Sequence, residues 1–286
     1  VLEFGESLEG PYLVQEYVEG PSVFQVLHRQ KQRGAFDIRL GARIVVDVAL
    51  GLDHAYTAAD EEGRPLRVIH RDVSPSNGLV SRKGLTKLID FGVATFEDRE
   101  TKTESGVLKG KLRYMAPEVL LRDQVTHTSD LYSLGIILYS LCVGQPAWTG
   151  ADEVTDRLRG LLPRPTDRHP SFDRELEAIL LRCLAINPKE RFQTGRDLAN
   201  ALTAWLARNG GVVTDPFVAA KIQELFPEGP TEWMSGYDLT QTTMGTRHTR
   251  QSGAWRWVAA GSAMLIVPAV AVLAGTLGAV WAYTLQ

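Results

Sequence analysis

The stretch 68-VIHRDVSPSN-77 guides the interpretation of the whole sequence. It places Asp72 and Asn77 in one short polar run directly after an apolar pair, and Asp90 follows a second apolar run further along. Carboxylate and amide oxygens suit Mg²⁺, which binds proteins through few side chains and completes its shell with substrate phosphates. The pattern therefore predicts a site for phosphoryl transfer.

Several further motifs stand in a fixed order around this stretch, and together with it they resemble the protein kinases, specifically the eukaryotic-like Ser/Thr kinases of bacteria. The matching segments are His70-Arg71-Asp72 with Asn77, Asp90-Phe91-Gly92, Ala116-Pro117-Glu118, "SDLYSLGIILYSL" with Asp130, and "NPKERF" with Arg191. The resemblance implies an α+β, protein-kinase-like fold with a mainly α-helical large lobe and a remnant of the small-lobe sheet.

The resemblance also implies roles for individual residues. Asp72 is expected to accept the proton of the substrate hydroxyl, while Asn77 and Asp90 hold the Mg²⁺ ions on the phosphates of ATP. Arg71 is expected to reach a phosphate on the segment between Asp90 and Glu118. The candidate phosphate acceptors in that segment are Thr95, Thr101, Thr103 and Ser105.

Other matching residues are expected to be structural. Asp130 should hold the backbone of the catalytic loop, and His70 should pack in the core rather than carry a proton. Arg191 should pair with Glu118. Phe91 and Gly92 complete the motif of Asp90.

An adenine pocket is implied by "LVQEYVEG", which resembles the strand and hinge of the family. Backbone groups near Glu16 and Val18 are the expected partners of adenine, and Gln15 stands where the side chain that guards the pocket would be. Leu79 is expected to pack under the ring.

Two positions depart from the family pattern. Ser74 stands where most Ser/Thr kinases have a lysine near the γ-phosphate, and Lys111 in "GKLRYMAPE" stands where they have a threonine. Either the cation and the hydroxyl have exchanged places, so that Lys111 supplies the active-site charge, or Lys111 is a solvated surface lysine and Ser74 a simple loss.

The phosphate-covering parts of the family pattern are missing. Nothing before Pro11 matches G-x-G-x-x-G-x-V, and no V-A-I-K lysine is present. The chain is therefore either an N-terminally truncated record of a complete kinase or a catalytically inactive, kinase-like binding protein at the membrane. We favour truncation because the large-lobe positions for catalysis are intact, and we expect the chain as given to be inactive.

Apolar residues recur with helical spacing along much of the chain, as in "IRLGARIVVDVALGLDHAYTAA", and "DLYSLGIILYSLCVG" is apolar almost all round, which predicts a buried central helix. The predicted organisation is a small-lobe remnant with the hinge over 1–20, the kinase large lobe over 21–209, a flexible juxtamembrane linker over 210–254 and a transmembrane helix over 255–284. One short amphipathic helix, "PFVAAKIQELF", is predicted within the linker.

The transmembrane prediction depends on the last residues. No charged residue follows Arg256, and the apolar run 257–283 exceeds the roughly 20 residues that cross a bilayer. Aromatic residues lie at both of its ends, and arginines precede it, which predicts a single-pass cell-membrane protein with the catalytic lobe in the cytoplasm. The alternative is a buried core helix containing Pro268.

Composition excludes some other classes. The formal net charge of −3 over 286 residues, with 44% hydrophobic residues, gives no sign of a nucleic-acid partner, so protein substrates and the membrane are the expected partners. The chain begins at Val1 and shows no N-terminal signal peptide. Cys142 and Cys183 lie in apolar helical patterns, which favours buried free thiols over a disulfide or metal ligands.

Overall fold

The computed structural model describes residues 3–7, 10–91, 112–150 and 152–229. Of these, the residues up to Glu19 fall into one compact unit and Gly20–Gly229 into a second, called here the helical body. The first unit contains an antiparallel hairpin of β1 (Glu3–Ser7) and β2 (Gly10–Val14). Its second strand overlaps the start of the strand and hinge predicted at "LVQEYVEG", whereas the first strand was not predicted.

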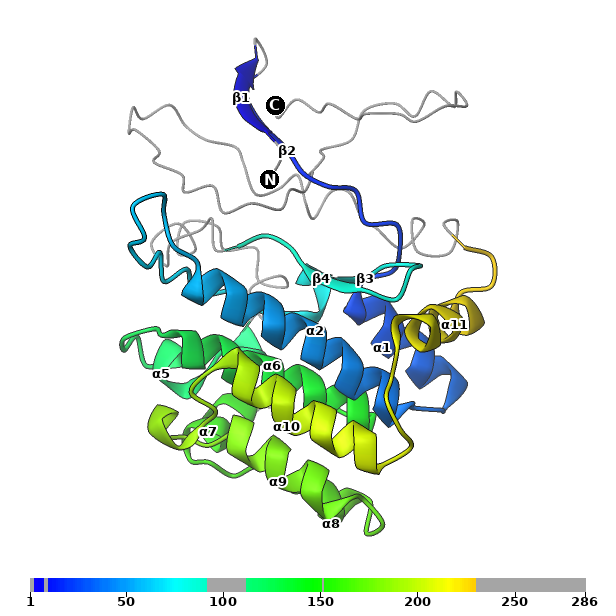
Figure 1. Ribbon diagram of the computed structural model, residues 1–286. Coiled ribbons are helices and arrows are strands. Elements are labelled where there is room, and N and C mark those ends of the chain that lie inside the picture. Colours follow the sequence, from blue (N-terminus) through cyan, green and yellow to red (C-terminus); the bar gives the residue numbers. More distant parts are fainter. Residues whose placement is uncertain (1–2, 8–9, 92–111, 151, 230–286) are drawn as a thin grey trace. The chain divides into compact units, whose positions relative to one another are not determined.

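The centre of the helical body is α6 (His127–Val143), whose residues are buried from Thr128 to the last turn. It packs against α2 (Ile38–Thr57), which in turn packs against α10 (Gly195–Arg208) (Figure 1). The prediction of a helix buried on all sides is confirmed. Close packing depends on a small residue here, because a Cβ at Gly135 would lie 2.6 Å from Cβ of Cys183.

Shorter helices cover the other side of α6. The last of them, α9, also contacts α10, and α8 contacts both α6 and α9. In chain order they are α5 (Pro117–Leu120), α7 (Glu153–Leu158), α8 (Pro165–Arg168), α9 (Arg174–Cys183) and the 3₁₀ turn η2 (Pro188–Glu190).

The helix α1 (Val23–Arg33) was not predicted from the sequence, although its ends carry clear signals. Ser22 and Gln25 form a capping box, in which each side chain accepts a hydrogen bond from the other residue's backbone N–H. At the other end Gly34 adopts the left-handed conformation, with φ 63°, that terminates many helices.

A small hairpin carries part of the candidate site. A 3₁₀ turn, η1 (Pro75–Asn77), leads directly into β3 (Gly78–Val80), which pairs antiparallel with β4 (Thr86–Leu88). The connecting turn needs Gly84, because its φ is +89° and a Cβ there would lie 1.9 Å from the backbone oxygen of Asp215. The turn from Ser81 to Gly84 therefore joins the two strands of this hairpin.

The short helix predicted within the 210–254 linker is present. Helix α11 (Asp215–Leu225) packs on α1 and α2 with Val218 and Ile222 buried. Arg43 of α2 donates to the backbone oxygen of Val213 at 2.7 Å and pairs with Asp215 at 2.7 Å. The apolar face of this helix was visible in the sequence, but its docking partners were not.

The predicted membrane span, 255–284, lies outside the described residues. Within the described ranges, no helix combines the length and apolar character that a bilayer crossing requires. Both cysteines are free and buried, as the sequence indicated, and burial raises the pKa of Cys183 to about 12.

Candidate active site

The candidate catalytic loop, residues 68–77, is bound through its backbone by Asp130 of α6. The Asp130 carboxylate accepts hydrogen bonds from the backbone N–H groups of His70 at 2.7 Å and Arg71 at 2.8 Å. Burial raises the pKa of Asp130 to about 7, although both hydrogen bonds oppose that rise. The predicted contact between Asp130 and the loop backbone is formed.

His70 lies in the core, as expected, with no exposed surface. One ring nitrogen, Nε2, lies 2.9 Å from the backbone oxygen of Ile89, and the ring packs against Phe91 with 4.6 Å between centroids. The other ring nitrogen, Nδ1, accepts from the backbone N–H of Asp72 at 3.2 Å. His70 therefore links the catalytic loop to the strand end that carries Asp90.

Asp72 and Asn77 are brought together directly. Nδ2 of Asn77 donates to the backbone oxygen of Asp72 at 2.7 Å and to its carboxylate at 3.3 Å. Because the amide nitrogen faces Asp72, the amide oxygen is the atom of Asn77 that can serve a cation. Ser74, which is buried, begins the 3₁₀ turn between the two residues.

Asp90 is placed beside Asn77 by the β3–β4 ladder. Gly78 pairs with Leu88, and the backbone N–H of Ile89 donates to the backbone oxygen of Asn77 at 2.8 Å. Asp90 follows directly and has φ +61°, a conformation that few residues other than glycine adopt and that is concentrated at functional sites. Asp72, Asn77 and Asp90 are all partly exposed, so a ligand can reach them.

This donor set fits a magnesium nucleotide. One amide oxygen and one carboxylate are typical of Mg²⁺ sites that are completed by waters and substrate phosphates. In such a site the ion neutralises phosphate charge, while the neighbouring Asp72 stands where a hydroxyl could give up its proton.

The residues predicted to bind adenine belong to two different compact units. Leu79 is buried at the centre of β3, opposite Lys87 and bridged to Ser22. Glu16 and Val18 belong to the other compact unit, so their place beside Leu79 remains a prediction.

Part of the predicted site lies outside the described residues. These residues are Gly92, Thr95, Thr101, Thr103, Ser105 and Lys111. The proposed exchange between Ser74 and Lys111 therefore remains a prediction, and so does the phosphate contact of Arg71, whose side chain is exposed.

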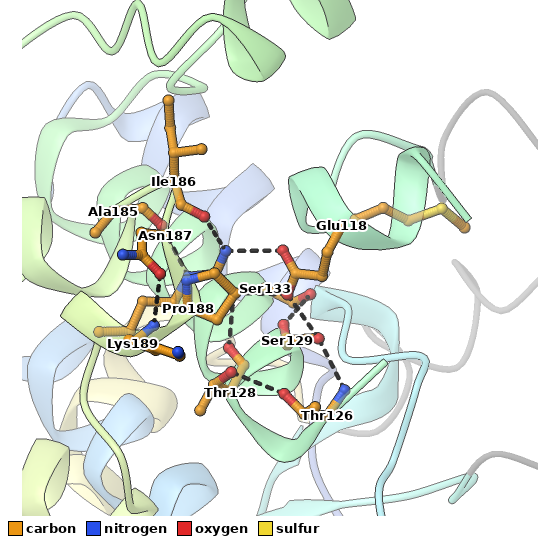
Figure 2. Close-up of polar contacts among 12 residues, drawn as sticks. Glu118, Thr126, Thr128, Ser129, Ser133, Ala185, Ile186, Asn187, Pro188 and Lys189 are labelled. Carbon is orange, nitrogen blue, oxygen red and sulfur yellow. Dashed lines mark hydrogen bonds and ion pairs between the residues drawn. The ribbon is translucent and has the colours of Figure 1, made fainter. Parts of the chain in front are cut away.

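The segment beyond 111 is anchored by the predicted ion pair. Nη1 and Nη2 of the fully buried Arg191 lie 2.7 and 2.8 Å from the two carboxylate oxygens of Glu118. Figure 2 shows Glu118 lying between Ser129 of α6 and the loop that contains Ile186. Ser129 donates to Oε1 of Glu118 at 2.7 Å. Burial favours a higher pKa for Glu118, but these hydrogen bonds outweigh it and hold the pKa below its ordinary value.

Sequence reasoning missed a second buried arginine in this region. Arg157 of α7 has no exposed surface and donates to the backbone oxygens of Leu112 and Met115. Its position in "EVTDRLRG" carries no recognisable signal, because arginines are common on short surface helices.

Comparison with known proteins agrees with this geometry. The family model described as "Protein kinase domain" matches residues 2–202. The chain belongs to the protein kinase family. Its described residues accordingly form the mostly helical part of a protein kinase fold with a small sheet.

Curated relatives of this kinase domain are bacterial. The chain is 34% identical over 202 residues to "Tyrosine-protein kinase MasK" of Myxococcus xanthus, covering 69% of this chain and 31% of the relative. It is 32% identical over 192 residues to "Serine/threonine-protein kinase PknB" of Mycobacterium leprae, covering 66% and 29%. A third relative, "Serine/threonine-protein kinase PknH" of Mycobacterium bovis, is 32% identical over 202 residues, covering 70% and 32%. The matched part thus spans about a third of these relatives.

Proposed function

We propose that this protein is a serine/threonine protein kinase that transfers the γ-phosphoryl group of ATP to protein hydroxyls. The observation that supports it best is the bonding of Asn77, which holds Asp72 through its side chain and the residue before Asp90 through its backbone. These bonds gather the three oxygen-bearing side chains that phosphoryl transfer requires.

In this proposal each residue has one task. Asp72 orients the substrate hydroxyl and accepts its proton. Asn77 and Asp90 hold Mg²⁺ against the phosphates, which offsets the charge that builds up during transfer. His70 and Asp130 contact no substrate and keep the loop in position.

The residue type that accepts the phosphate needs a test of its own, because the similar proteins include one kinase named for tyrosine and others named for serine/threonine. The wider match to bacterial Ser/Thr kinases supports serine and threonine. A degenerate peptide library with one central serine, threonine or tyrosine tests this. Incorporation of phosphate into serine and threonine peptides supports the proposal, and incorporation into tyrosine peptides alone contradicts it.

We also propose that residues 1–286 by themselves transfer little phosphate. A glycine-rich loop and a strand lysine supply much of the electrostatic stabilisation in this family, and neither motif occurs in these residues. Purified residues 1–286 should bind ATP weakly at most, whereas the protein expressed from the whole gene should phosphorylate itself or a substrate. Strong ATP-dependent autophosphorylation of residues 1–286 would contradict this.

Membrane anchoring through 255–284 is proposed from the sequence, with the kinase domain in the cytoplasm. The uncharged run after Arg256 and the arginines before it support this orientation. Deleting 257–286 should move the protein to the soluble fraction. Protease added outside spheroplasts should leave the kinase domain intact, and its cleavage there would contradict the orientation.

A further inference from the structure

Arg157 is a buried cation that is bound mainly by backbone groups. Its Nη1 lies 2.8 Å from the backbone oxygen of Leu112 and 2.8 Å from that of Met115. Its Cζ lies 5.1 Å from the centroid of the Trp148 ring. Among the described residues, Nε and Nη2 have no hydrogen-bond partner, so burying this charge is costly, and keeping an arginine here indicates a specific task.

The two carbonyls that Arg157 binds belong to one turn. The backbone N–H of Met115 donates to the backbone oxygen of Leu112 at 3.3 Å, which closes the turn directly before Ala116-Pro117-Glu118. From the same helix, Glu153 lies 3.5 Å from Arg113 in the middle of this turn. Helix α7 therefore binds the segment 112–115 in two ways: Arg157 binds its backbone and Glu153 binds the side chain of Arg113.

The other end of this segment is held by α6. Ser129 bonds Glu118, and the next residue along the helix, Asp130, bonds the backbone of the catalytic loop. The segment 112–118 and the loop that carries Asp72 are thus anchored to adjacent residues of one buried helix. A protein substrate whose hydroxyl reaches Asp72 must place its neighbouring residues on surface near that loop, and the partly exposed residues 112–114 can form such a surface.

We propose that Arg157 is a positioning residue for the protein substrate, because it fixes the backbone of 112–115 in the shape that the substrate chain meets. This inference rests on the proposed function. The residues proposed to hold the ATP phosphates, Asn77 and Asp90, flank the β3–β4 hairpin and are not part of 112–115. A looser segment 112–115 should therefore raise the KM for the peptide and leave the KM for ATP unchanged.

Arg168 provides a control, because it is an arginine that binds backbone oxygens away from the candidate site. Arg168 donates to the backbone oxygens of Pro146 at 2.7 Å and Ala147 at 3.2 Å. Its Cζ lies 5.5 Å from the centroid of the Tyr139 ring. It therefore makes the same kinds of contact as Arg157, but to the loop that follows α6, and it is partly exposed whereas Arg157 is fully buried.

The test compares Arg157→Lys with Arg168→Lys, since lysine keeps the charge but cannot reproduce the planar fork of arginine. Melting temperatures of both variants establish that they fold. In the whole-gene protein, with the best peptide from the degenerate library, Arg157→Lys should raise the peptide KM about tenfold or more, the size expected for losing a charged hydrogen bond. The KM for ATP should stay within about twofold of wild type, as should both KM values in Arg168→Lys.

A second measurement does not depend on activity. Hydrogen exchange by mass spectrometry should show faster exchange of the amides of 112–118 in Arg157→Lys than in wild type and in Arg168→Lys. An unchanged peptide KM, an equal rise in both variants, or equal exchange of 112–118 in both variants would overturn the inference. If wild type transfers no phosphate at all, the proposed function fails, and the exchange experiment still decides whether Arg157 orders this segment.

Discussion

Arg191 contacts both carboxylate oxygens of Glu118 across 73 positions of the chain, with N–O distances of 2.7 and 2.8 Å. The same arginine donates to the backbone oxygens of Ala185 and Ile186, so all three nitrogens of the guanidinium are hydrogen-bonded. The pair therefore connects the end of the segment 112–118 to the loop before η2.

Replacing Glu118 with glutamine should destabilise the fold strongly, because it leaves the buried charge of Arg191 uncompensated. Losing one partner of a buried ion pair typically costs about 3–5 kcal/mol. The exposed pair of Glu175 with Arg208 supplies the control, since Glu175→Gln should cost about 1 kcal/mol or less. Urea unfolding of both variants measures this difference, and similar losses would contradict the structural role given to the buried pair.

Asp130 should make stability fall as pH rises. Its folded pKa, about 7, lies above the value of about 3.9 expected when unfolded, so the folded state binds more protons between these values. Stability from this group is present below about pH 4 and is lost as pH rises toward 7, with a slope of at most about 1.4 kcal/mol per pH unit.

Asp130→Asn should be less stable than wild type, since one amide oxygen cannot accept both loop N–H groups as the carboxylate does. The unfolding free energy of this variant should also lack the part of the pH dependence that comes from protonation of Asp130. Unfolding free energies measured from pH 4 to 7 compare the two proteins, and parallel curves would show that Asp130 does not titrate as described.

Local patterns predicted much of the fold. Helix α6 was predictable because apolar residues on all its faces leave burial as the only stable arrangement, and α2 because its apolar residues recur at helical spacing. Helix α1 carries both capping signals and an apolar face with Val23 and Val26, but its apolar residues are confined to its first half and the rest of the helix is polar. Docking of α11 depends on Arg43 reaching Val213 and Asp215, a contact between distant residues that no local pattern encodes.

The candidate site was predictable for a different reason. Asp72, Asn77 and Asp90 stand at spacings that phosphoryl transfer requires, so motif and chemistry agree. Arg157 was not predictable, because its partners are backbone oxygens of Leu112 and Met115, and backbone groups carry no sequence signature.

The hypothesis that cation and hydroxyl have exchanged places between Ser74 and Lys111 can be tested by mutation. If Lys111 supplies the active-site cation, Lys111→Met in the whole-gene protein should reduce kcat about 10²-fold or more, the cost of removing one preorganised electrostatic contact. The double replacement of Ser74→Lys with Lys111→Thr should restore part of that loss. Wild-type turnover in Lys111→Met would show that Lys111 is a surface residue.

The most direct test of kinase activity is phosphate transfer from radiolabelled ATP by the whole-gene protein and its Asp72→Asn variant. Asparagine keeps the shape of the side chain but cannot accept the proton, so transfer should fall by about 10²-fold or more, in line with general-base contributions. ATP binding, which in the proposed function depends on Asn77 and Asp90, should remain. No transfer by wild type, or equal transfer by wild type and Asp72→Asn, would contradict the proposed function.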